Sequence, residues 1–179
     1  FGNHIVKCKT VVLLLFILLS FNLYSIEKTD DQYINEKFFG MHFHRGVDGI
    51  QYIPDDIIFS YWRLWDTGTT WSNIEHSQDV WDFSKIDEAV KIAEERNIQI
   101  ILVLGMTPTW ASKFPKRKSA YGNALRGATA PPKDLSDWEN YISVLTERYN
   151  GKIKYWEIWN EPNLPGFYSG SVKELSILT

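Results

Sequence analysis

Residues 153–163 read IKYWEIWNEPN, a short apolar run that ends in an amide, a carboxylate and a proline. A run this short and this apolar is typical of a strand buried on both faces, as in a parallel sheet. Pro162 has no backbone N–H and ends the hydrogen-bond ladder of a strand. The stretch therefore predicts a buried parallel strand over 153–159 that presents Asn160 and Glu161 at its carboxyl end.

Three similar apolar runs precede this one, at 38–43, 61–65 and 98–104. Two segments with the periodicity of amphipathic helices lie between the later runs, at 84–96 and 136–149. Strands that alternate with helices indicate βα units and a parallel sheet.

The connections after the strands are long, at 66–83 and 106–134, whereas those that lead from helix to strand are tight. A (β/α)8 TIM barrel builds its active site from such strand-to-helix loops. An open doubly wound sheet also binds ligands at its strand ends, but no glycine-rich phosphate loop follows the first run. A complete barrel has about 250 residues. We therefore expect an α/β chain that forms a barrel truncated after about four βα units.

The first 25 residues have the pattern of a signal peptide. Lys7 and Lys9 precede an apolar run over 11–21, and Ser25 offers a small residue at a cleavage site. The run is shorter than the about 20 residues of a membrane span. We expect a signal peptide over 1–25 and a secreted or periplasmic domain over 26–179. No stable membrane insertion is expected after cleavage. The alternative is an N-terminal membrane anchor.

Composition narrows the class of partner. The chain of 179 residues has 19 Lys and Arg against 22 Asp and Glu, and no basic stripe that would indicate a nucleic-acid partner. The basic run over 116–118 is interpreted as a solvated loop. The single cysteine, Cys8, lies in the signal segment, so we expect no disulfide and no thiol nucleophile in the mature chain.

Glu161 is the candidate for acid/base chemistry. Glycoside cleavage uses two carboxyl groups, one that protonates the leaving oxygen and one that attacks or activates water. The proton donor needs a raised pKa, and an aromatic neighbour such as Trp159 would limit its solvation. Asn160 is placed to hydrogen-bond a sugar hydroxyl.

Residues 155–163 resemble the acid/base motif of clan A glycoside hydrolases, and most closely that of glycoside hydrolase family 39 and its exopolysaccharide-cleaving relatives. The resemblance extends over about 38–170. Four further segments carry it in the same order as in the family: 39–42, 62–66, 71–83 and 104–112.

The resemblance implies a retaining β-glycosidase that acts on a carbohydrate by double displacement and needs no cofactor. Glu161 would protonate the leaving group and then deprotonate the incoming water. The family's nucleophile is a Glu on strand seven, and we expect that strand to lie beyond Thr179. The 179-residue fragment is therefore expected to be inactive, and the resemblance leaves the sugar open.

Strand alternation predicts Glu157, Trp159 and Glu161 on one side of the last strand. A buried carboxylate such as Glu157 needs a partner, and Arg63 is the candidate. In the clan, the arginine of strand two supports the nucleophile, so the resemblance gives Arg63 a second interpretation.

His42 and His44 share a face of the first strand and are candidates for sugar binding. Two histidines at this spacing also begin the metal site of amidohydrolase barrels. That alternative expects a Lys or another metal ligand at the end of the fourth strand, where this chain has Asn160 and Glu161, so no metal is expected. A non-catalytic glycan-binding barrel is the third hypothesis.

The ends of predicted strands, or the residues just beyond them, include Trp65, Trp71 and Trp110. Large aromatic rings stack on flat apolar ligand faces, so one or two of these are candidates for sugar binding. Packing in the core or in a loop is the alternative interpretation for each.

Overall fold

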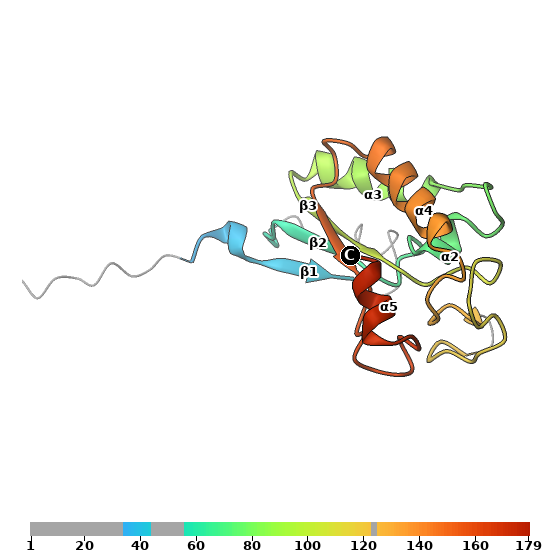
Figure 1. Cartoon of the computed structure of the whole chain (residues 1–179). Coiled ribbons are helices and arrows are strands. Elements are labelled where there is room, and N and C mark those ends of the chain that lie inside the picture. Colours follow the sequence, from blue (N-terminus) through green and yellow to red (C-terminus); the bar gives the residue numbers. More distant parts are fainter. Residues whose placement is uncertain (1–33, 44–55, 123–124) are drawn as a thin grey trace, which may run out of the picture. The chain divides into compact units, whose positions relative to one another are not determined.

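The computed structural model describes residues 34–43, 56–122 and 125–179 (Figure 1). Contacts divide the chain into two compact units, Phe1–Asn35 and Glu36–Thr179. The predicted signal peptide over 1–25 and the candidate His44 lie outside the described residues. No helix within the described ranges is long and apolar enough to cross a membrane.

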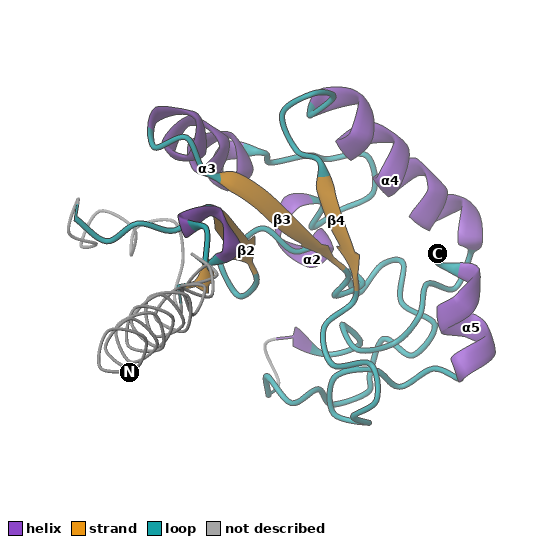
Figure 2. Ribbon diagram, turned by 90° about the vertical axis from the view of Figure 1, so that its left-hand side faces the viewer, coloured by secondary structure: helices purple, strands orange, loops and turns teal. Residues whose placement is uncertain are grey.

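The second unit alternates strands and helices in the predicted order (Figure 2). The four strands fall within the four predicted apolar runs, and the two long helices match the predicted helical segments to within one residue at each end. In chain order the elements are η1 (Glu36–Phe38), β1 (Gly40–His42), β2 (Tyr61–Leu64), α2 (Trp71–Ile74), α3 (Ser84–Glu95), β3 (Gln99–Leu104), α4 (Leu135–Arg148), β4 (Tyr155–Ile158) and α5 (Val172–Ile177).

The strands form a parallel sheet in the order β1-β2-β3-β4. The register pairs Trp62 with Ile100 and Leu102 with Trp156. Because every strand runs the same way, all four carboxyl ends lie at one edge of the sheet, which confirms the predicted parallel α/β arrangement.

Alternation along the strands sorts side chains onto two faces. Trp62 and Leu102 are fully buried in the main apolar cluster. Residues of α3 and α4 complete this cluster, so it is the face that the helices cover. Arg63 and Glu157 occupy the alternate positions and contact each other on the opposite face. The sequence period therefore separates an apolar face that the helices cover from a face that carries the charged pair, which we call the polar face although Val103 is also buried there.

The β2–α3 connection carries a buried carboxylate. Glu75 follows α2 and is 0% exposed. Its Oε2 accepts a hydrogen bond from the Trp71 indole at 2.6 Å, and its Oε1 accepts one from the Asp79 backbone N–H at 2.9 Å. Burial raises the pKa of Glu75, although the two hydrogen bonds oppose the rise.

A raised carboxyl pKa makes stability fall as pH rises. Between the ordinary Glu pKa of 4.5 and the higher pKa of the folded state, the folded chain binds more protons than the unfolded chain. Wild-type unfolding free energy, measured relative to Glu75→Gln by urea titration, should therefore decrease as pH rises from 4 to 7.5. The exposed Glu95→Gln variant is the control. Parallel wild-type and Glu75→Gln profiles would contradict the prediction.

Candidate active site

Left-handed backbone gathers where the strands end. Asp66 follows β2 with φ 52°, Met106 follows β3 with φ 63°, and Trp159 and Glu161 follow β4 with φ 65° and 46°. Such conformations cost roughly 1–3 kcal/mol at a non-glycine residue and are concentrated at functional sites. The clustering at one edge of the sheet marks that edge as the candidate site.

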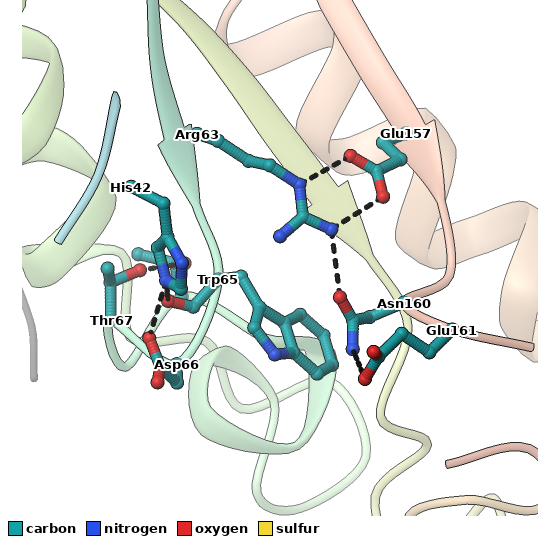
Figure 3. A network of polar contacts seen from close by, with 9 residues as sticks. His42, Arg63, Trp65, Asp66, Thr67, Glu157, Asn160 and Glu161 are labelled. Atoms are coloured by element: carbon teal, nitrogen blue, oxygen red, sulfur yellow. Dashed lines mark hydrogen bonds and ion pairs between the residues drawn. The ribbon is translucent and has the colours of Figure 1, made fainter. Parts of the chain in front are cut away.

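Arg63 joins two strands on the polar face (Figure 3). Its Nε donates to Glu157 Oε2 at 2.7 Å, and its Nη2 donates to Glu157 Oε1 at 2.6 Å and to Asn160 Oδ1 at 2.9 Å. The predicted pairing of Arg63 with Glu157 is confirmed. The hydrogen bonds to Glu157 hold the pKa of Arg63 above its ordinary value.

The network continues from Asn160 to Glu161. Asn160 is 6% exposed, and its Nδ2 donates to Glu161 Oε2 at 3.2 Å. A guanidinium only donates hydrogen bonds, so the amide oxygen must face Arg63 and the amide N–H groups must face Glu161. Glu161 itself is exposed. The arrangement presents an accessible carboxylate whose position is fixed through a buried amide.

The predicted alternation past Ile158 is wrong for Trp159. β4 ends at Ile158, and the left-handed turn at Trp159 brings Asn160 to Arg63 in its place. The Trp159 ring is 1% exposed, donates to the Phe167 carbonyl at 2.8 Å and contacts the edge of Tyr168 at 4.9 Å. Trp159 therefore packs in the main core instead of flanking the carboxylate.

His42 links β1 to the end of β2. Its Nε2 lies 2.9 Å from both the Trp65 carbonyl oxygen and Asp66 Oδ1. Both neighbours are acceptors at neutral pH, so Nε2 carries the proton. Over the described ranges, no three His, Cys, Asp or Glu side chains come together in a group that would hold a metal ion.

The three candidate tryptophans occupy different environments. Trp65 lies among the network residues of Figure 3, is 7% exposed and contacts Tyr121 edge-on at 6.2 Å. Trp110 donates to the Glu75 carbonyl at 2.9 Å and contacts Trp71 edge-on. Trp71 is fully buried, so the packing interpretation is confirmed for it. Sugar stacking by Trp65 or Trp110 stays a prediction.

Tyr121 lies beside the site and was not among the sequence candidates. Its ring contacts Trp65 at 6.2 Å and Phe167 at 5.5 Å. Burial, together with the nearby charges of Glu161 and Asp66, raises the pKa of Tyr121 to about 12. It comes from the long β3–α4 loop, where no periodicity indicates which side chain turns inward.

The chain is similar in sequence to known glycosidases. The model of Glycosyl hydrolase family 10 matches residues 66–174, more than half of the chain. A β-xylosidase of Geobacillus stearothermophilus is 26% identical over 142 residues, which are 72% of this chain and 27% of that protein. A β-xylosidase of Caldicellulosiruptor saccharolyticus is 32% identical over 89 residues, 43% of this chain and 18% of that protein. The chain thus spans less than a third of these relatives.

Solved structures show the same fold. A family 39 glycoside hydrolase from Bacteroides cellulosilyticus WH2 aligns with a TM-score of 0.54 and 18% identity over 78% of this chain and 27% of that one. A GH39 enzyme from Xanthomonas axonopodis pv. citri aligns with a TM-score of 0.51 and 18% identity over 78% and 30%. With the family match, these similarities confirm the predicted resemblance to clan A.

Arg63 and Glu157 should be energetically coupled. Their side chains are 27% and 37% exposed, so a double-mutant cycle of Arg63→Met and Glu157→Gln should give about 1–2 kcal/mol, less than the cost of breaking a fully buried pair. Arg63→Met should cost more than Glu157→Gln, because it also removes the donor to Asn160. Urea unfolding measures each term.

The matched control is the pair between Asp87 and Arg148, whose side chains are each 44% exposed. The cycle of Asp87→Asn and Arg148→Met should give less than about 1 kcal/mol. Equal coupling in the two cycles would show that the Arg63 pair is an ordinary surface interaction.

Proposed function

The chain belongs to glycosyl hydrolase family 10, and from this premise we propose that it supplies the acid/base side of a retaining β-glycoside hydrolase. The observation that carries the proposal is the continuous relay from Arg63 through Asn160 to Glu161. The relay fixes an exposed carboxylate at the carboxyl end of a parallel strand, the edge at which barrel enzymes perform their chemistry.

The proposed reaction has two displacement steps. In the first, protonated Glu161 gives its proton to the glycosidic oxygen as the bond from that oxygen to C1 breaks, and a second carboxylate forms a bond to C1. In the second, ionised Glu161 takes a proton from water as the water oxygen bonds to C1 and the second carboxylate leaves. Both carboxyl groups return to their starting states, so no cofactor is required.

The second carboxylate is assigned to a strand other than β1–β4. Within the described network, Glu157 accepts hydrogen bonds from Nε and Nη2 of Arg63, and Asp66 accepts one from His42. The division of the sheet into a helix-covered apolar face and a polar face fits one side of a (β/α)8 barrel, whose remaining strands would carry the nucleophile.

Export to the periplasm or the medium is proposed from the pattern of residues 1–25.

Asn160 has a positioning role and a binding role in this proposal. Its Oδ1 is occupied by Arg63 and one amide hydrogen faces Glu161. Because Nδ2 carries two hydrogens, we assign the second to a sugar hydroxyl of the ligand. Binding and proton transfer are thereby fixed by the same side chain.

Glu161→Ala in the full-length protein should lower turnover about 10²–10⁴-fold on aryl β-glycosides with poor leaving groups, because these need general-acid assistance. Leaving groups of low pKa should still depart in the first step, and added azide should restore turnover by attacking the glycosyl-enzyme without needing a base. The measurement is steady-state hydrolysis with detection of a β-glycosyl azide.

The control is Glu95→Ala, which removes an exposed carboxylate at the end of α3, on the side where β3 begins, and should leave every rate unchanged. A Glu161→Ala variant that matches wild type on every cleaved substrate would contradict the assignment of Glu161. A wild-type protein that binds glycans but cleaves none would favour the non-catalytic glycan-binding barrel.

A further inference from the structure

The β3–α4 loop differs in charge from the rest of the chain. The chain as a whole has a net charge of −3, yet residues 106–133 contain no Asp or Glu. Basic residues of this stretch are Lys113, Lys116, Arg117, Lys118, Arg126 and Lys133. A loop of one sign on a chain of the opposite net sign concentrates positive potential at one place.

This loop borders the candidate site. The Ala120 backbone N–H donates to the Gly166 carbonyl at 3.0 Å, which ties the loop to the segment that follows Glu161. The next residue, Tyr121, contacts Trp65. Figure 2 shows the loops gathered beyond the carboxyl ends of β3 and β4. The basic run over 116–118 therefore directly precedes the part of the loop that packs against the site.

The loop is held in place by contacts within itself. Gly127 has φ +78°, and a Cβ there would lie 2.8 Å from Ser112 Oγ and from Pro115 Cα. Ser112 Oγ donates to the Gly127 carbonyl at 2.7 Å, and the Gly127 N–H donates to the Arg117 carbonyl at 2.8 Å. The backbone of Arg117, the central residue of the basic run, is thus fixed by its hydrogen bond to Gly127.

Three of the loop's charges have no counter-ion among the residues that the structure describes. Lys113 pairs with Glu174 at 2.6 Å and Lys133 lies 3.5 Å from Asp134. Lys116, Arg117 and Lys118 are exposed, and none of the carboxylates that the structure describes pairs with them. These three side chains form what we call the cationic rim.

We propose that the cationic rim binds the acidic groups of an anionic polysaccharide whose backbone enters the site at Glu161. The proposal rests on the proposed function, since it names the substrate class for that site. Guanidinium and ammonium groups pair with carboxylate and sulfate oxygens, and Arg117 can do so through two parallel hydrogen bonds. The carboxylates of Glu161 and Asp66 repel an acidic sugar at the cleaved bond, so the acidic groups belong on residues farther along the polymer.

The test uses the full-length protein and three polymers with one backbone. These are glucuronoxylan, the same polymer after reduction of its carboxyl groups, and sulfated β-1,4-xylan. Binding is measured by affinity electrophoresis, and hydrolysis of aryl β-glycosides is measured separately. Wild type should bind an acidic form about tenfold more tightly than the reduced form, and the preference should shrink as the Debye length falls from about 10 Å at 0.1 M salt toward 3 Å at 1 M.

The variant that removes the rim is Lys116→Ala/Arg117→Ala/Lys118→Ala, which should lose most of the preference for the acidic polymer. Its control, Lys91→Ala/Lys152→Ala/Lys154→Ala, removes three exposed charges from α3 and from the amino end of β4 and should keep the preference. Preference for the carboxylated polymer alone assigns uronate as the ligand, and preference for the sulfated polymer alone assigns sulfate.

Equal binding of acidic and neutral polymers by wild type, or an unchanged preference in the rim variant, would overturn the proposal. The proposed function fails by a different result: charge-dependent binding without hydrolysis of any glycoside. Hydrolysis of aryl glycosides without charge-dependent binding refutes the anionic substrate and retains the glycosidase.

Discussion

The guanidinium of Arg63 is the constraint on which the candidate site depends. It cannot lose its proton in a protein, so its partly buried position requires a carboxylate, and Glu157 supplies both oxygens. Arg63 is level with Ile101 of the neighbouring strand, whereas Glu157 is level with Val103. The side chain therefore reaches across β3 and two residues toward the carboxyl end, the direction in which Asn160 lies. One cation thus ties two non-adjacent strands and orients the amide that holds Glu161.

The strand ends make this geometry possible at a conformational cost. Left-handed residues turn the chain sharply after β2, β3 and β4, and such turns persist only where packing compensates for them. Trp159 shows how: its ring covers Gly105 so closely that a Cβ there would lie 3.0 Å from the indole. The buried tryptophan stabilises the turn that brings Asn160 to Arg63, so the apolar core and the polar network are two consequences of the same bend.

Periodicity was sufficient to predict the regular elements and one contact of the site. The partner of Glu157 followed from two rules, that buried carboxylates are paired and that alternate strand residues share a face. The rules fail after Ile158, because a tryptophan at position 159 gives no sign of the positive φ that it adopts. Glu75 and Tyr121 were missed for a related reason: both lie in long connections, where the direction of a side chain is set by tertiary packing and not by sequence spacing.

The proposed chemistry and the proposed substrate preference reside in separate parts of this structure. The floor of the site is predominantly acidic, and its guanidinium is committed to Glu157 and Asn160, so an acidic group on a ligand gains little there. The positive charges of Lys116, Arg117 and Lys118, which pair with no carboxylate of the described residues, lie on the β3–α4 loop, which shares no hydrogen bond with Arg63 in the described contacts. Changes at sites without shared partners tend to be additive. In the proposed function, a change in the charge of the loop therefore alters the preferred glycan and leaves intact the hydrogen bonds from Arg63 through Asn160 to Glu161.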